Sequence, residues 1–311
     1  MKPRDAAIAA LQMRQCDVVP HFELEMQLAR EYFGRDFTSR EQWAADPSLR
    51  ARYLGSDASL FVEIADAFDY CAILYSHVHR PTEDDYIEGI CRLREADGAR
   101  RLLLAHGDST LSITDGSGMA QLAIDLYEHP ARLKDREDRK VDEALEKAPR
   151  LMKAGIEGFA LCSDYCFNSG PFMSPSMFAE FVAPYLTRLI SGYREMGACV
   201  IKHTDGDIMP ILDQLVAAGP HALHSLDPMA GVDVREVKRL YGNKVCLIGN
   251  VNCALMQTGT DEDILSSCRY AMESCKPGGG YIFSTTHVMP ASANVESVAA
   301  AFEHVLEVGK Y

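Results

Sequence analysis

The sequence is short of positive charge. Lysine and arginine together number 31 against 45 aspartates and glutamates, which gives a formal net charge of −14. Nucleic acids and anionic membranes are recognised through basic patches, so this imbalance argues against either as a partner. The chain also has no apolar run near the roughly 20 residues that a membrane-spanning helix needs, so no membrane segment is expected.

Two further motifs are missing. The ten cysteines, scattered from Cys16 to Cys275, include no C-x-x-C pair, and the N-terminus M-K-P-R-D does not read as a secretory signal. We therefore expect a cytoplasmic protein with reduced thiols. No G-x-G-x-x-G follows the first predicted strand, which argues against a doubly wound dinucleotide-binding sheet.

Eight short apolar runs are present, and a helical pattern follows each one. We expect strands at 18–24, 72–79, 101–108, 158–164, 200–207, 222–228, 245–251 and 280–287. The runs are continuous rather than alternating, as in strands that are buried on both faces. This pattern predicts an α/β protein with the (β/α)8 TIM-barrel fold. Residues 35–70 are expected to hold several short helices.

No linker or low-complexity segment divides the chain. We therefore predict one (β/α)8 barrel domain over residues 1–311, with additional helical segments near its N-terminus.

Titratable side chains gather at the ends of the predicted strands. They are Glu23, His77 or His79, His106, Asp108, Asp164, His203, Asp205, His224, Asp227 and His287, with Asn250 among them. Active sites of barrels lie at the C-terminal ends of the strands. Imidazole and carboxylate groups suit Zn²⁺ and, less specifically, Fe²⁺ or Mn²⁺. His203 and Asp205 are the strongest pair, because residues two apart project from the same side of a strand.

Each of these side chains also has a plainer interpretation. A histidine at a strand end is more often a hydrogen-bonded wall residue than a metal ligand. Asp227, which precedes a proline, can cap the following loop, and Asp164 can brace a backbone amide. Phe172 and Met173 are most simply core or pocket wall, although they could line an apolar substrate site.

Four segments carry a resemblance to a known family: D-Y-C-F-N-S-G-P-F-M-S-P (164–175), I-K-H-T-D-G (201–206), L-I-G-N-V (247–251) and P-G-G-G-Y-I-F-S (277–284). Over most of its length the chain resembles the uroporphyrinogen decarboxylase-like superfamily, a (β/α)8 fold that includes corrinoid-dependent methyltransferases. The decarboxylases hold a polycarboxylate porphyrinogen with an R-Q-A-G-R-Y type motif, whereas the corresponding stretch here reads H-F-E-L-E. The chain looks most like the methyltransferase I components of corrinoid O-demethylase systems.

The resemblance also implies a zinc site. Zinc methyltransferases of this superfamily carry His-x-Cys after the fifth strand and another Cys after the eighth, where this sequence has His203, Asp205 and His287. Replacing thiolates with oxygen and nitrogen ligands leaves more positive charge on zinc and makes it a better Lewis acid. The alternative is that metal binding was lost or moved, with Glu23 or Glu25 joining the site.

By this resemblance, the chain is an O-demethylase methyltransferase that moves a methyl group from a methoxylated, aromatic substrate to cob(I)alamin, with zinc activating the ether oxygen. The cobalamin is carried by a partner corrinoid protein, because the chain has no D-x-H-x-x-G motif. Catalytic roles are expected for Asp164, Tyr165 and His224. Substrate contacts are expected for the set Phe22, Glu23, His106, Phe172, Met173 and Asn250.

Other functions stay open at this point. One is methyl transfer from methylcobalamin to a thiol or folate, and another is a uroporphyrinogen decarboxylase-like protein without metal. A third is a catalytically silent barrel that binds a small molecule. Because the superfamily often dimerises, a homodimer is a further possibility.

Overall fold

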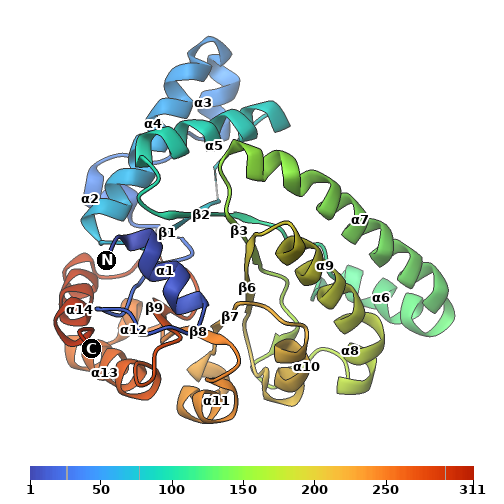
Figure 1. Ribbon diagram of the computed structural model, residues 1–311. Helices are drawn as coiled ribbons and strands as arrows, with labels where there is room; N and C mark the ends of the chain where they lie inside the picture. Colours follow the sequence, from blue (N-terminus) through green and yellow to red (C-terminus); the bar gives the residue numbers. More distant parts are fainter. Residues whose placement is uncertain (26, 77, 291) are drawn as a thin grey trace.

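A parallel sheet forms the centre of the computed structural model, which describes residues 1–25, 27–76, 78–290 and 292–311 (Figure 1). Within these residues the sheet has seven strands in the order β1-β2-β3-β6-β7-β8-β9. They are β1 (Ala72–Tyr75), β2 (Leu102–His106), β3 (Gly158–Leu161), β6 (Cys199–Thr204), β7 (Ala222–Ser225), β8 (Cys246–Val251) and β9 (Tyr281–Thr285). The sheet curls, and each strand matches a predicted apolar run. The predicted α/β class is confirmed, and the curled sheet is consistent with a TIM barrel.

The first predicted strand, 18–24, is wrong as a regular strand. It forms isolated bridges, Val18 with Lys310 and His21 with Phe283 of β9. Phe283 N donates to Pro20 O at 2.9 Å, and Cys71 N, just before β1, donates to His21 O at 2.8 Å. The segment therefore hydrogen-bonds beside both edge strands of the sheet. Pro20 has no N–H to donate, which limits how far a ladder can extend here.

Helices surround the sheet (Figure 1). The first five along the chain are α1 (Pro3–Leu11), α2 (Ala29–Phe33), α3 (Arg40–Ala45), α4 (Arg50–Ala67) and α5 (Glu83–Asp97). The following ones are α6 (Gly116–Glu128), α7 (Pro130–Ala154), α8 (Pro175–Phe181), α9 (Ala183–Glu195) and α10 (Leu212–Ala217). The last are α11 (Val234–Tyr241), α12 (Leu255–Thr258), α13 (Asp261–Cys275) and α14 (Val295–Val308). A short hairpin of β4 (Cys166–Phe167) and β5 (Gly170–Pro171) follows β3. The 3₁₀ turn η1 (Pro47–Leu49) lies between α3 and α4, and η2 (Met209–Ile211) and η3 (Pro228–Ala230) follow β6 and β7.

The expectation of several short helices in 35–70 is only half right, because α4 is a continuous helix of 18 residues. Leu54, Ala58, Phe61 and Ala65 recur at helical spacing and are buried against the sheet and neighbouring helices. This apolar stripe stabilises one long helix in place of several short ones.

Helix α1 covers the end of the sheet at which the strands begin. Arg4 N in α1 donates to Arg100 O at 3.0 Å, two residues before β2 starts, and α1 contacts β1, β2 and β9. In Figure 1 it lies in front of these strands. The candidate site is therefore at the opposite end, where the strands finish.

All ten cysteines are free thiols. Within the described ranges, no helix combines the length and the apolar character that crossing a bilayer requires.

Candidate active site

Three predicted ligands meet at the C-terminal end of the sheet. Donor atoms of His203, Asp205 and His287 all lie within 4.8 Å of one another. Asp205 Oδ2 is 3.1 Å from His287 Nδ1 and 3.7 Å from His203 Nε2. Side-chain exposure rises from 4% at His203 to 28% at Asp205 and 51% at His287, so the cluster opens toward solvent on one side.

The strand register explains how these side chains converge. His203 on β6 is the direct neighbour of His224 on β7, and Thr204 is the neighbour of Ser225. Side chains opposite each other in parallel strands project from the same face. The two imidazoles therefore lie together, with 2.7 Å between their Nδ1 atoms. Because this contact uses Nδ1 of His203, its Nε2 is the nitrogen that faces Asp205.

Asp205 is held by a second group of contacts. Its Oδ1 accepts a hydrogen bond of 2.5 Å from the Ser225 hydroxyl, and its backbone N donates to Asp164 Oδ1 at 3.0 Å. Ser225 has a positive φ of 86°, a backbone conformation uncommon outside glycine. Asp164 thus braces a backbone amide, which was the plainer interpretation of its sequence position.

The electrostatics favour neutral buried imidazoles beside an ionised carboxylate. Burial lowers the pKa of His203 and lowers that of His224 well below its usual value. The hydrogen bond with Asp205 raises the pKa of His287. Burial opposes ionisation of Asp205, but the contacts with His287 and His203 outweigh it and lower the pKa of Asp205. Neutral imidazole and ionised carboxylate are the forms that bind metals.

The donor set fits a catalytic zinc ion. Such sites use three protein ligands and leave one position for water or substrate. Ligands about 2.0–2.2 Å from a tetrahedral zinc lie roughly 3.3–3.5 Å apart, close to the spacings around Asp205. His287, whose side chain is half-exposed, keeps the cluster accessible to solvent on one side.

Glu23 and His224 lie behind these ligands. Glu23 is 3% exposed and accepts hydrogen bonds from Thr285 N at 2.9 Å and from the Ser284 hydroxyl at 3.3 Å. Burial raises the pKa of Glu23 to about 7. Ser284 also lies 3.2 Å from His224 Nε2. Sequence reasoning missed Ser284, because nothing in its neighbourhood along the chain distinguishes it from other strand residues.

Lys202 is a second residue that sequence reasoning missed. It precedes His203 on β6 and so projects from the opposite face of the sheet. Its fully buried ammonium donates to Asp108 Oδ2 at 2.9 Å and to the carbonyls of Leu161 and Ser163 at 3.2 and 2.8 Å. The ammonium lies 4.1 Å from the centre of the Tyr165 ring. Asp108, a strand-end carboxylate in the sequence, therefore belongs to this ion pair.

Tyr165 is fully buried beside Lys202, and its hydroxyl lies 2.5 Å from Thr110 Oγ1. Asp227 accepts a hydrogen bond from Met229 N and caps the turn that begins at Pro228. This is the capping role that its position before a proline indicates. His79 is partly buried, and His77 lies outside the described residues.

The predicted substrate contacts do not form one group. Phe22 and Met173 are buried in the core, and Phe172 packs partly buried against it. Asn250 is buried next to β7, where its amide donates to Leu226 O at 2.9 Å. His106 lines a separate cavity of about 350 Å³ together with residues of α7.

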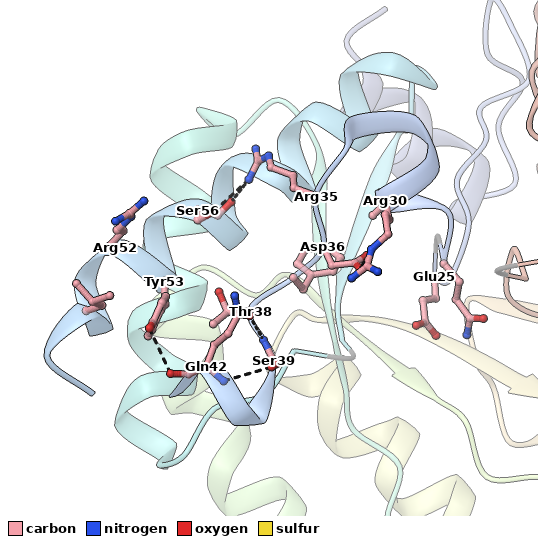
Figure 2. Close-up of a pocket in the computed structure, with 14 residues that line it drawn as sticks. Glu25, Arg30, Arg35, Asp36, Thr38, Ser39, Gln42, Arg52, Tyr53 and Ser56 are labelled. Atoms are coloured by element: carbon pink, nitrogen blue, oxygen red, sulfur yellow. Dashed lines mark hydrogen bonds and ion pairs between the residues drawn. The ribbon is translucent and has the colours of Figure 1, made fainter. Parts of the chain in front are cut away.

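A larger cavity, of about 1040 Å³, is lined by Glu25, Gln27 and Arg30, by residues 35–39 and by side chains of helices α3 and α4. Figure 2 shows Glu25 on one side of it and Gln42 and Tyr53 on the other. Met289, two residues after His287, donates its backbone N–H to Glu25 O at 2.9 Å, and Gln27 N donates to Met289 O at 3.0 Å. Its charge also contributes to the raised pKa of His287. Glu25 therefore links the lining of this cavity to the surroundings of His287, whereas none of the three donors lines the cavity.

Residues 110–308, more than half of the chain, match the uroporphyrinogen decarboxylase (URO-D) family. The chain belongs to the URO-D family. The resemblance seen in the sequence is confirmed at this level. The match begins after β2 and includes all three candidate ligands, His203, Asp205 and His287.

Curated relatives of this URO-D chain include uroporphyrinogen decarboxylases of Thioalkalivibrio sulfidiphilus (strain HL-EbGR7) and Shewanella piezotolerans (strain WP3 / JCM 13877). They are 25% and 24% identical over 73% and 60% of this chain, and over 66% and 51% of their own length. The chain thus spans about half to two thirds of these relatives. A solved methyltransferase from Methanosarcina mazei has a similar fold, with a TM-score of 0.74 at 16% identity over 99% of this chain and 98% of its own.

Proposed function

We propose that this protein is a corrinoid-dependent methyltransferase of the URO-D family. It transfers a methyl group from a methoxylated, aromatic substrate to cob(I)alamin on a partner corrinoid protein. The observation that carries the proposal is the His203–Asp205–His287 cluster at the open end of the sheet. The likeness over nearly the whole chain to a methyltransferase fold supports it. We propose further that the protein is cytoplasmic and that 1–311 forms one closed barrel domain.

His203, Asp205 and His287 would hold zinc in this proposal. When bound, zinc supplies Lewis acidity that stabilises the negative charge appearing on the ether oxygen as the methyl group leaves. An aryl alkoxide is a poor leaving group, so this stabilisation has to supply several kcal/mol. The harder ligand set, with Asp205 and His287 where the zinc methyltransferases of the superfamily carry cysteine, suits a weakly basic ether oxygen.

The remaining residues position this centre. The Ser225 hydroxyl and the Asp164 carboxylate orient the side chain and backbone of Asp205. The cavity of about 1040 Å³ beside Glu25 has room for an aromatic ring and for the approach of a partner. Its lining includes Phe37 and Tyr53, which are suited to contact a ring.

The test is metal analysis combined with methyl transfer. Purified protein should contain about one zinc per chain and should demethylate a methoxyarene when supplied with a reduced corrinoid protein. His203→Ala and His287→Ala should lose both zinc and activity, whereas His129→Ala, which changes an exposed histidine between α6 and α7, should keep both. Full activity of the two ligand variants without zinc would reject the mechanism.

A second candidate is uroporphyrinogen decarboxylation, which the names of the curated relatives favour. It needs positive groups for a polycarboxylate substrate, and the stretch 21–25 reads H-F-E-L-E. Incubating the protein with uroporphyrinogen and following carbon dioxide release separates the two. Decarboxylation by the wild type, with no methyl transfer, would favour this second function.

A further inference from the structure

A chain of hydrogen bonds runs from the candidate ligand His203 to a buried carboxylate. His203 Nδ1 lies 2.7 Å from His224 Nδ1, and His224 Nε2 lies 3.2 Å from Ser284 Oγ. Ser284 Oγ lies 3.3 Å from Glu23 Oε2. The four residues belong to β6, β7, β9 and the segment 18–24, and none of them is more than 3% exposed as a whole residue.

Metal binding at His203 would set the direction of every bond in this chain. Nε2 of His203 faces Asp205 and would bind the metal, so Nδ1 would carry the ring proton. The Nδ1–H group would then donate a hydrogen bond to His224 Nδ1. His224 then carries its own proton on Nε2 and donates to the Ser284 hydroxyl. That hydroxyl donates in turn to Glu23, which accepts as a carboxylate.

The end of the chain is held independently of the metal. Thr285 donates to Glu23 through its backbone N at 2.9 Å and also through its hydroxyl. The carboxylate is therefore fixed in place where Ser284 can reach it. A buried polar chain in which each donor has an acceptor holds its members in one arrangement.

We propose that Glu23 is a positioning residue for the metal, acting on His203 through Ser284 and His224. A carboxylate bonded directly to a ligating histidine usually fixes its tautomer and raises its basicity as a ligand. Here two intervening side chains transmit the same effect. The inference rests on the metal site of the proposed function. The sequence predicted a substrate contact for Glu23 and a catalytic role for His224. The inference instead assigns both residues to positioning the metal.

Zinc affinity of the full chain tests this proposal. Competition with a chromophoric chelator would compare the wild type with Glu23→Gln, Ser284→Ala and the double variant. Each single change should weaken zinc binding about tenfold. The double variant should be no weaker than the poorer single one, because both changes break one chain. Losses that multiply, or single variants that bind as tightly as the wild type, would overturn the proposal.

Glu137→Gln is the matched control. Glu137 is also fully buried, but it pairs with Arg136 and Lys140 on α7, away from the chain described above. It should leave zinc affinity unchanged even if it lowers stability. A loss of zinc binding in this control equal to that in Glu23→Gln would show a general effect of a buried amide and would overturn the proposal.

Nitrogen-15 NMR of the zinc-loaded wild type gives a readout that requires no variant to fold. The expected spectrum has His203 protonated at Nδ1 and His224 protonated at Nε2. The opposite tautomer of His224 would overturn the chain. If the wild type binds no zinc, both this inference and the metal-dependent function fail. If it binds zinc and transfers methyl groups but the variants match it, only this inference fails.

Discussion

Replacing Lys202 by methionine should destabilise the protein strongly. Lys202 is fully buried, and its ammonium contacts Asp108 and two backbone carbonyls on the helix side of the sheet. Removing one partner of a buried ion pair costs about 3–5 kcal/mol, because the other charge stays buried without compensation. Asp108 would keep three donors, from Ser163 N, Thr110 N and the Thr110 hydroxyl. We therefore expect the free energy of unfolding to fall by about 3 kcal/mol, the lower end of that range.

Urea unfolding followed by circular dichroism measures this loss. The double variant Lys202→Met/Asp108→Asn should recover about 1–2 kcal/mol of it, because no charge is then left buried. Lys134→Met, which removes an exposed lysine paired with Glu180, should cost less than about 1 kcal/mol. A loss below about 1 kcal/mol for Lys202→Met would refute the buried-pair reasoning.

The Lys202–Asp108 pair also makes the free energy of unfolding depend on pH in the acid range. Burial opposes ionisation of Asp108, but the Lys202 charge and the Thr110 hydrogen bonds lower its pKa to about 2. A carboxylate with a lowered pKa in the folded state stabilises the protein above its unfolded pKa, and this contribution is lost as pH falls toward 2. The wild type should therefore lose more stability between pH 4 and pH 2 than the double variant does.

Three other outcomes follow from the site. The pKa of Glu23 is raised to about 7. As pH rises from 4.5 to 7, the free energy of unfolding of the zinc-free wild type should therefore fall by roughly 3 kcal/mol relative to that of Glu23→Gln. Unfolding at each pH measures this difference, and equal pH profiles of the two proteins would contradict it. Zinc affinity should rise with pH through and beyond 6.5, since zinc must displace the proton from His287, whose pKa is raised; a chelator titration that is flat over this range would contradict it. Ser225→Ala should weaken zinc binding a few-fold by releasing Asp205 Oδ1, with Ser112→Ala, a partly buried serine whose hydroxyl donates to Ile113 O, as control; unchanged affinity would show that Asp205 needs no such support.

Elements were predictable because their signals are local. The apolar runs identified the seven strands that the described residues form in the sheet. The segment 18–24 was misjudged because Pro20 limits its ladder to bridges, although its apolar pattern resembles the other strands. The helix α4 was underestimated because its buried stripe is diluted by charged residues on the outer face.

The site was only partly predictable. Spacing on one strand grouped His203 with Asp205, and family resemblance added His287; the structure brings the three donors within 4.8 Å. Their roles in binding zinc stay a prediction, as does the single-domain organisation. Tyr165 and Asp108 are also strand-end residues, but both lie beside Lys202 on the other face of the sheet. Position in the sequence could not separate these two groups.

The sequence by itself determined the fold class, the family and the strand ends at which chemistry can occur, because hydrophobic periodicity and family motifs are properties of neighbouring residues. Only the tertiary structure decided which side chains share a face and which become partners. Glu23 and Ser284 are 261 positions apart, and Lys202 and Asp108 are 94 apart. Such contacts depend on the register of strands in a curled sheet, and a one-residue shift would turn each side chain to the opposite face.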